Sequence, residues 1–135
     1  MKTSYFSQLK NINLKEENLH PIAVCLYPPN YYKGDVYQKL APSNEMLMEF
    51  KKSRQTDADK ERLENRYKEE ILSKLDARQI YDELGDNALL LCFEKDFCHR
   101  HFIADWFKQE LGIDVLEWQK EPIDNFHQIS FDEYF

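Results

Sequence analysis

The amino-acid sequence predicts an α/β fold, a small parallel-sheet sandwich with helices on both faces. Two short apolar runs, residues 22–27 and 88–93, each end in prolines or charged residues and are typical of buried strands. Helical patterns separate the two runs, another helix follows, and residues 113–118 form a third candidate strand. This order of strands and helices favours parallel strands joined by crossover connections.

The composition indicates one domain, which we expect to span residues 1–118. The chain has 135 residues, 42% of them hydrophobic and 14% aromatic, which is enough for a packed core. A net charge of −7 disfavours a broad DNA-binding face, and no apolar run is long enough to cross a membrane. The first residues lack the apolar core of a secretory signal, so we expect a cytoplasmic protein whose three cysteines are free thiols.

Local patterns place the helices. Residues 3–19 contain scattered apolar positions that suggest a short helix beginning at Ser4. Between the two apolar runs, Ser, Thr and Asp residues occur where helix N-caps are expected. They predict helices over residues 44–52, 57–75 and 77–84, capped by Ser43, Thr56 and Asp76.

The last predicted helix begins after Asp96, taken as its N-cap, and ends near Leu111, with Gly112 just beyond it. The tail, residues 119–135, is acidic and rich in aromatic side chains. We expect this tail to dock on the domain or on a partner.

The turn between the second apolar run and this helix carries Cys98, His99 and Arg100 in succession. Backbone N–H groups at a helix N-terminus attract anions and stabilise a thiolate, and an arginine can hold a phosphate through two hydrogen bonds. Neighbouring helical residues point about 100° apart, so all three side chains cannot share one ligand. We therefore take Cys98, His99 and Glu94 as candidate catalytic residues, Glu94 orienting His99 or pairing with Arg100, and Arg100 as a candidate ligand-binding residue.

The loop after the first apolar run adds Tyr31, Tyr32 and Lys33 as candidate ligand-binding residues. If the two strands are neighbours, this loop faces the Cys98 turn, because ligands sit beyond the carboxyl ends of parallel strands. Two structural alternatives stay open. The tyrosines could merely cover the edge of the sheet, and Arg100 could form a buried ion pair with Glu94 instead of binding a ligand.

The other cysteines, Cys25 and Cys92, lie in apolar runs and are typical of small core residues. A metal site formed by Cys92, Cys98, His99 and His101 does not match the spacing of a zinc knuckle, so we expect no metal and no cofactor.

The segments LCFEK (residues 91–95) and FCHR (residues 97–100), with an apolar helix containing Trp106, resemble the domain of unknown function family number 488 of bacteria, archaea and phages. Further similarity lies at Pro28-Pro29 and in residues 40–43 and 67–75, and the resemblance covers roughly residues 3–118. It implies a compact α/β sandwich with the Cys-His-Arg turn beside the end of the first strand. Members often carry an arginine near that strand end, where this chain has Cys25-Leu26-Tyr27.

Three functions follow as hypotheses. The first is a site for a nucleotide, a phosphate or the end of a nucleic acid at the Cys98 turn, in an enzyme or a sensor. The second is a Cys98-dependent hydrolase or transferase. The third is a non-enzymatic interaction protein that uses the aromatic tail.

Overall fold

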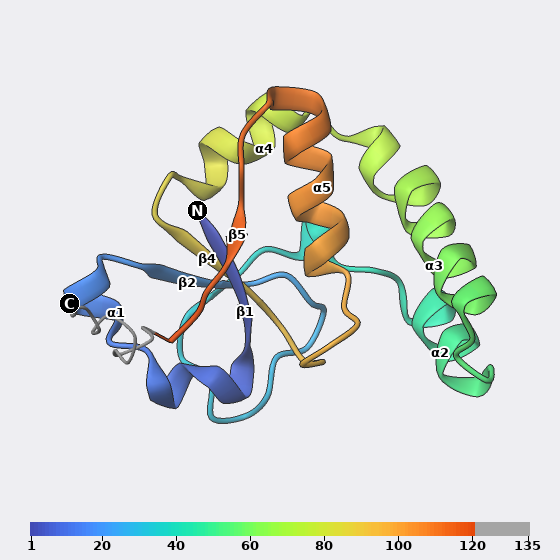
Figure 1. Cartoon of the computed structure of the whole chain (residues 1–135), viewed down its shortest axis with the longest axis horizontal. Helices are drawn as coiled ribbons and strands as arrows, with labels where there is room; N and C mark the ends of the chain where they lie inside the picture. Colours follow the sequence, from blue (N-terminus) through green and yellow to red (C-terminus); the bar gives the residue numbers. More distant parts are fainter. Residues whose placement is uncertain (121–135) are drawn as a thin grey trace, which may run out of the picture.

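The computed structural model describes residues 1–120 and shows a five-stranded parallel sheet with the strand order β3-β2-β4-β1-β5. Figure 1 shows the strands at the centre of the molecule and the helices at its periphery. The strands are β1 (Lys2–Tyr5), β2 (His20–Ala23), β3 (Asp35–Val36), β4 (Ala88–Cys92) and β5 (Leu116–Glu117). The predicted α/β class with a parallel sheet is confirmed.

Strand β4 is the centre of the core, and its side chains alternate between two apolar clusters. Ala88, Leu90 and Cys92 face a large cluster that includes side chains of the helices. Leu89 and Leu91 face a smaller cluster on the other side of the sheet. Since every residue of β4 is buried, its sequence is a continuous apolar run rather than an alternating one.

The elements that cover the sheet are α helices and short 3₁₀ segments. The helices are α1 (Leu14–Glu17), α2 (Asn44–Lys52), α3 (Asp57–Glu70), α4 (Ala77–Leu84) and α5 (Arg100–Leu111), and the 3₁₀ segments are η1 (Phe6–Asn11), η2 (Gln38–Leu40) and η3 (Leu72–Lys74). None of these helices is long and apolar enough to cross a membrane within residues 1–120.

The chain near its N-terminus differs from the predicted helix at Ser4. Residues Lys2–Tyr5 instead form a strand between β4 and β5, and a 3₁₀ turn follows it. Both buried positions of this strand are polar residues, Thr3 and Ser4. Because these side chains break the apolar pattern, the sequence gives no strand signal there.

The three predicted N-caps are confirmed. The side chains of Ser43, Thr56 and Asp76 accept hydrogen bonds from backbone N–H groups in the first turns of α2, α3 and α4. Helix α3 ends at Glu70, and a separate 3₁₀ turn occupies the last part of the predicted helix.

Helices α2 and α3 form a hairpin at one side of the molecule (Figure 1). Arg66 of α3 ties the hairpin together, since it pairs with Glu45 and Glu49 of α2 and with Glu70 of its own helix. The hydroxyl of Tyr67 donates to the Leu40 carbonyl oxygen at 2.6 Å and so anchors the hairpin to the body of the domain.

The predicted start of α5 is wrong. The helix begins at Arg100, with His99 at the N-cap position, so Asp96 does not cap it and Cys98 lies just before it. The chain follows bends from residue 93 onward, because Cys98 and His99 are bound to the strands rather than to the first turn of the helix. Gly112 ends the helix in the left-handed conformation, as predicted. The predicted docking of residues 119–135 falls almost wholly outside the described residues.

Candidate functional site

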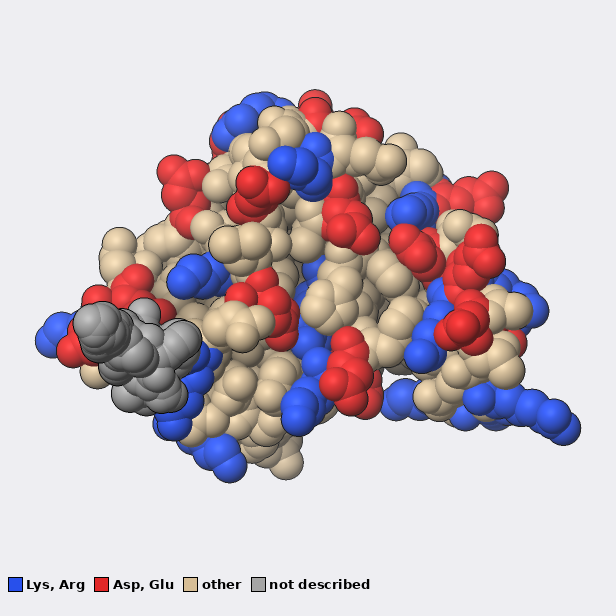
Figure 2. Space-filling view, in the orientation of Figure 1, with Lys and Arg blue, Asp and Glu red and all other residues tan. Residues whose placement is uncertain are grey.

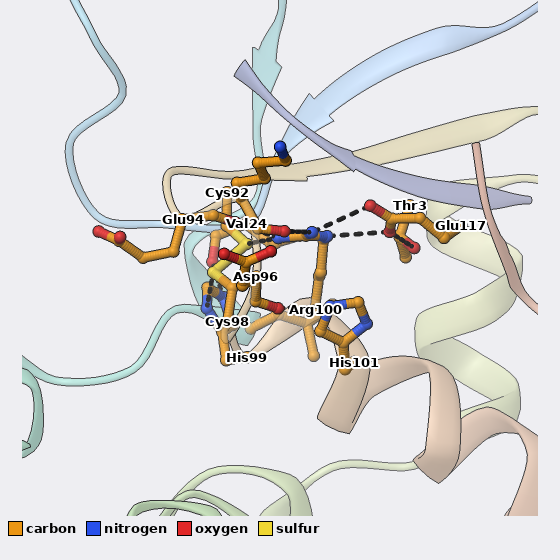
Figure 3. The surroundings of a disulfide bond; sticks show 12 residues. Thr3, Val24, Cys92, Glu94, Asp96, Cys98, His99, Arg100, His101 and Glu117 are labelled. Carbon is orange, nitrogen blue, oxygen red and sulfur yellow. Dashed lines mark hydrogen bonds and ion pairs between the residues drawn. A yellow bond between two sulfur atoms is a disulfide. The ribbon is translucent and has the colours of Figure 1, made fainter. Parts of the chain in front are cut away.

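The Cys98 turn is fixed to the end of β4 by a disulfide between Cys92 and Cys98 (Figure 3). The expectation of three free thiols is therefore wrong for this pair, and only Cys25 is free among the described cysteines. The prediction that Cys92 is a core residue is right about its burial, but the strand-to-helix turn brings it against Cys98. Burial raises the pKa of the Cys25 thiol to about 11, so Cys25 stays protonated at neutral pH.

His99 is buried at the carboxyl end of β2. Its Nε2–H donates to the Val24 carbonyl oxygen at 2.6 Å, which leaves Nδ1 unprotonated and facing Cys98 Sγ at 3.6 Å. Burial lowers the pKa of His99 to about 4, so the ring is neutral at pH 7. The edge of Tyr67 packs on the ring with centroids 5.5 Å apart. His99 is thus a fixed acceptor directed at the Cys98 sulfur.

Arg100 is fully buried and points to the opposite side, toward β1 and β5 (Figure 3). It forms a two-pronged ion pair with Glu117, with both N–O distances 2.9 Å. Its remaining donors reach the Glu94 and Lys95 carbonyl oxygens and Cys92 Sγ, the last at 3.3 Å. Since every N–H group of the guanidinium has an acceptor, none is left to bind a ligand.

The alternative of a buried Arg100 ion pair is therefore the observed arrangement, but with a different partner. The carboxylate comes from Glu117 of β5, and Glu94 contributes only its backbone oxygen. The Glu94 side chain is exposed and points away from His99 and Arg100 in Figure 3. In this position the Glu94 side chain does not orient His99.

A cavity of about 640 Å³ opens over Cys98 and His99. One wall is the loop after β4, with Glu94, Lys95 and Asp96. The other wall is the α2–α3 hairpin, and Figure 2 shows a hollow between this hairpin and the body of the domain. The residues that line it are Cys25, Pro42, Leu47, Phe50, Lys51, Gln55, Lys60, Leu63, Tyr67, Cys92, Phe93, Glu94, Lys95, Asp96, Phe97, Cys98, His99 and Phe102.

The aromatic loop after β2 lies elsewhere. Strands β2 and β4 are neighbours, as the loop argument required, yet Tyr31, Tyr32 and Lys33 are not among the cavity residues. Tyr32 packs edge-on against Phe6 in the smaller apolar cluster, and its hydroxyl donates to the Asp35 carbonyl oxygen. Burial raises the pKa of Tyr32 to about 12. Tyr31 is exposed.

The sequence-based reasoning missed the hairpin wall. Phe50, Lys51, Lys60 and Tyr67 look like ordinary residues of amphipathic helices, and only the packing of the hairpin turns them toward the Cys98 turn. Lys60 is the clearest example, since its Nζ lies 5.4 Å from the centre of the Phe97 ring. No pattern within either helix identifies these residues as part of a site.

Three potential metal-ligand atoms come together at the base of the cavity. Cys92, Cys98 and His99 each offer one, and these atoms all lie within 4.8 Å of one another. All three residues are buried and all three line the cavity. The chain therefore carries a Cys/His cluster at the end of its central strand.

A comparison with protein-family models supports the resemblance seen in the sequence. No curated protein and no solved structure matches the chain. A family model, DUF488-N3a, described as the active DUF488-N3 subclade, matches residues 4–111. This match runs from the second half of β1 to the end of α5 and includes the disulfide, His99 and the hairpin wall. The chain belongs to the DUF488 family, as a member that matches the DUF488-N3a model.

Proposed function

We propose that the chain binds an anionic ligand of the nucleotide class in the cavity over Cys98, as an enzyme or a sensor. The observation that carries this proposal is the cavity itself, with lysines on two facing walls and the Cys98–His99 pair at its base. Its volume of about 640 Å³ is within the range typical of small-molecule sites.

The charge of the cavity supports an anion. Lys51 and Lys60 come from the hairpin and Lys95 from the opposite loop, and none of the three takes part in an ion pair among residues 1–120. Glu94 and Asp96 also line the loop wall, so the hairpin wall is the more basic one. A phosphate bound between the walls would lie closest to Lys51 and Lys60.

The apolar part of the lining supports a planar group beside that anion. Phe50 and Phe97 lie with ring centroids 5.2 Å apart, and Phe97 and Phe102 lie 5.5 Å apart. A nucleobase gains free energy by stacking on such rings whatever its sequence context. The face shown in Figure 2 carries acidic and basic side chains side by side, which favours a local pocket over a broad nucleic-acid surface.

A thermal-shift series with nucleotides and inorganic phosphate tests this function. Stabilisation by at least one nucleotide is expected in the wild-type chain, and Lys60→Ala should reduce it because it removes a cation from the hairpin wall. Lys33→Ala is the matched control, since Lys33 is an exposed lysine outside the cavity. No shift with any compound would count against the proposal. A shift lost in Lys33→Ala but kept in Lys60→Ala would move the site to the aromatic loop.

A Cys98-dependent hydrolase or transferase is a second candidate, favoured by the 3.6 Å approach of His99 Nδ1 to Cys98 Sγ. In the reduced chain the Cys98 thiol can donate to Nδ1, and the bond from Nε2 to Val24 holds the acceptor in place. With this second candidate we infer a cytoplasmic location, because thiols are kept reduced there.

The rate of alkylation of reduced Cys98 as a function of pH tests the second candidate. A thiol pKa clearly below about 8.5 is expected if the site activates the sulfur. Cys25→Ser removes one competing thiol, and mass spectrometry of the peptides separates Cys98 from Cys92, which reduction frees as well. An ordinary thiol pKa would rule out an activated nucleophile.

A further inference from the structure

The base of the cavity is built like a metal site, although the spacing of its residues in the sequence led us to expect none. Cys92 lies at the end of β4, while Cys98 and His99 lie on the turn before α5. The bends between them fold the turn back on the strand, so that two sulfur atoms and one imidazole nitrogen lie within 4.8 Å of one another. The spacing of these residues in the sequence does not show that the turn folds back onto the strand.

We propose that the reduced chain binds one zinc-class divalent cation through Cys92 Sγ, Cys98 Sγ and His99 Nδ1. Two thiolates and an imidazole are ligands that Zn²⁺ prefers. The two thiolate charges would balance the charge of the cation, so that the buried cluster is neutral as a whole. This inference does not depend on the proposed nucleotide site, because it uses the base of the cavity and not its lysine wall.

The surroundings of the three ligands support the proposal. A histidine that binds a metal through one nitrogen usually donates its other N–H to a carbonyl or carboxylate. His99 shows this arrangement, since Nε2 is bound to the Val24 carbonyl oxygen at 2.6 Å and Nδ1 faces the sulfur atoms. The ring is therefore already in the tautomer and orientation that a metal requires.

Arg100 would stabilise the thiolate of Cys92, the second sulfur ligand. Its Nη1 lies 3.3 Å from Cys92 Sγ, so a Cys92 thiolate would accept a charge-assisted hydrogen bond. The arginine charge is already paired with Glu117 and cannot by itself balance two thiolates. A dication between the two sulfur atoms fills that role.

The fourth coordination position would face the cavity. Cys92, Cys98 and His99 all line it, and Cys25, although it lines the same cavity, is not part of the set of atoms within 4.8 Å. Three protein ligands with one position open to water or a ligand are typical of catalytic zinc sites, whereas structural sites are closed by four protein ligands. The geometry points to the open type.

The disulfide must be reduced before the metal can bind. With a phosphine reductant, the S–S bond takes up two electrons and two protons, and the phosphine becomes its oxide with the oxygen of one water molecule, whose protons go to the two thiols. Binding of the cation then releases these two protons to the buffer, while the neutral His99 ring contributes its lone pair without losing a proton.

The test uses the full chain, reduced with a phosphine under anaerobic conditions and titrated with Co²⁺ as a spectroscopic probe for zinc. We expect one Co²⁺ per chain, with a sulfur-to-cobalt charge-transfer band and the strong visible bands of tetrahedral cobalt. Zn²⁺ should abolish these bands by displacement. Absence of the bands in the reduced wild-type chain would overturn the proposal.

Substitutions locate the site. Cys92→Ser and Cys98→Ser should each weaken Co²⁺ binding by more than about 100-fold, a larger loss than removal of an outer contact causes. Cys25→Ser is the matched control, a buried cysteine of the same cavity, and should keep the spectrum. An unchanged spectrum in Cys92→Ser or Cys98→Ser, or loss of the bands in Cys25→Ser, would place the metal elsewhere and contradict the assignment.

A measurement on the wild-type chain alone protects the test against variants that fail to fold. One equivalent of Zn²⁺ should slow alkylation of Cys92 and Cys98, read by mass spectrometry of the peptides, and leave Cys25 unaffected. Equal alkylation with and without zinc would overturn the proposal. The nucleotide shift is measured on metal-free chain, so failure of one proposal is distinguishable from failure of the other.

Discussion

Two sides of one turn behave in opposite ways. Cys98 and His99 face the cavity, whereas Arg100, the next residue along the chain, faces the interior between the turn and β5. His99 has one nitrogen directed at a sulfur atom at the base of the cavity, and Arg100 has every donor satisfied. Of these three consecutive residues, Cys98 and His99 line the cavity, whereas Arg100 holds the turn in place.

The difference teaches that charge and position in a motif do not identify a ligand-binding residue. Arginine suggests a phosphate site, yet here its guanidinium joins the loop carbonyl groups to Glu117. The lysines that line the cavity come from the α2–α3 hairpin, at Lys51 and Lys60, and from the loop at Lys95. The following predictions test this division, from the largest expected effect to the smallest.

Arg100→Ala should have the largest effect on stability. It leaves the Glu117 carboxylate and two loop carbonyl groups without their partner, which for a buried pair costs about 3–5 kcal/mol of unfolding free energy. Urea unfolding measures this loss. Arg78→Ala, which breaks the exposed pair with Asp82, is the control and should cost much less, because solvent screens exposed pairs. Equal losses in both variants would show that Arg100 is not the structural member of the turn.

His99 should make the chain sensitive to acid. Its pKa is about 4 in the folded chain and 6.5 in the reference state, so the unfolded chain binds the proton more strongly between these values. Stability is therefore complete above pH 6.5 and falls as the pH decreases toward 4, by on the order of 3 kcal/mol.

Urea midpoints measured across this pH range test the His99 prediction. His99→Gln can still donate to the Val24 carbonyl oxygen but does not titrate, so its stability should depend less on pH than that of the wild-type chain. Identical pH profiles for the two chains would contradict a buried neutral histidine.

Reduction of the Cys92–Cys98 bond should lower stability by about 2 kcal/mol in the presence of a chelator, because the unfolded chain regains the freedom of a short closed loop. The comparison is urea unfolding of the oxidised and the reduced chain. Cys92→Ser should show no effect of the reductant, and Cys25→Ser should respond like the wild type. A reductant effect that persists in Cys92→Ser would have another origin.

Lys60→Ala should have the smallest effect on stability, less than about 1 kcal/mol, since it removes only a partly exposed contact with the Phe97 ring. The same variant should reduce nucleotide binding in the thermal-shift series. A large loss of stability would show that Lys60, like Arg100, stabilises the fold. The contrast between the residues of the cavity and Arg100 would then no longer hold.

Local signals in the sequence were sufficient for much of the fold. Ser43, Thr56 and Asp76 cap their helices because the cap and its acceptor lie within a few residues. The apolar run 88–93 was recognised because β4 is covered on both faces. Strand β1 was not predicted, because the burial of Thr3 and Ser4 depends on tertiary packing. Glu117, which accepts the hydrogen bond of the Thr3 hydroxyl, lies on the neighbouring strand but far away in the sequence.

The candidate site was predictable only in part. The sequence identified the turn and the burial of Cys92, but not the bond between Cys92 and Cys98 or the outward direction of Glu94. It could not identify Glu117 as the partner of Arg100, since nothing in the sequence says which strand lies beside β1. The hairpin wall depends on tertiary packing, and no local pattern in the sequence predicts it.

The strand order has a consequence for the synthesis of the chain. Strand β1 is made first, yet its parallel neighbours are β4 and β5, with Lys2 in register with Leu89 and Leu116. The first strand therefore cannot pair while the ribosome is still adding the middle of the chain. Such non-local pairing slows folding and leaves early segments exposed. We expect the sheet to close late, after the Cys-His-Arg turn has left the ribosome.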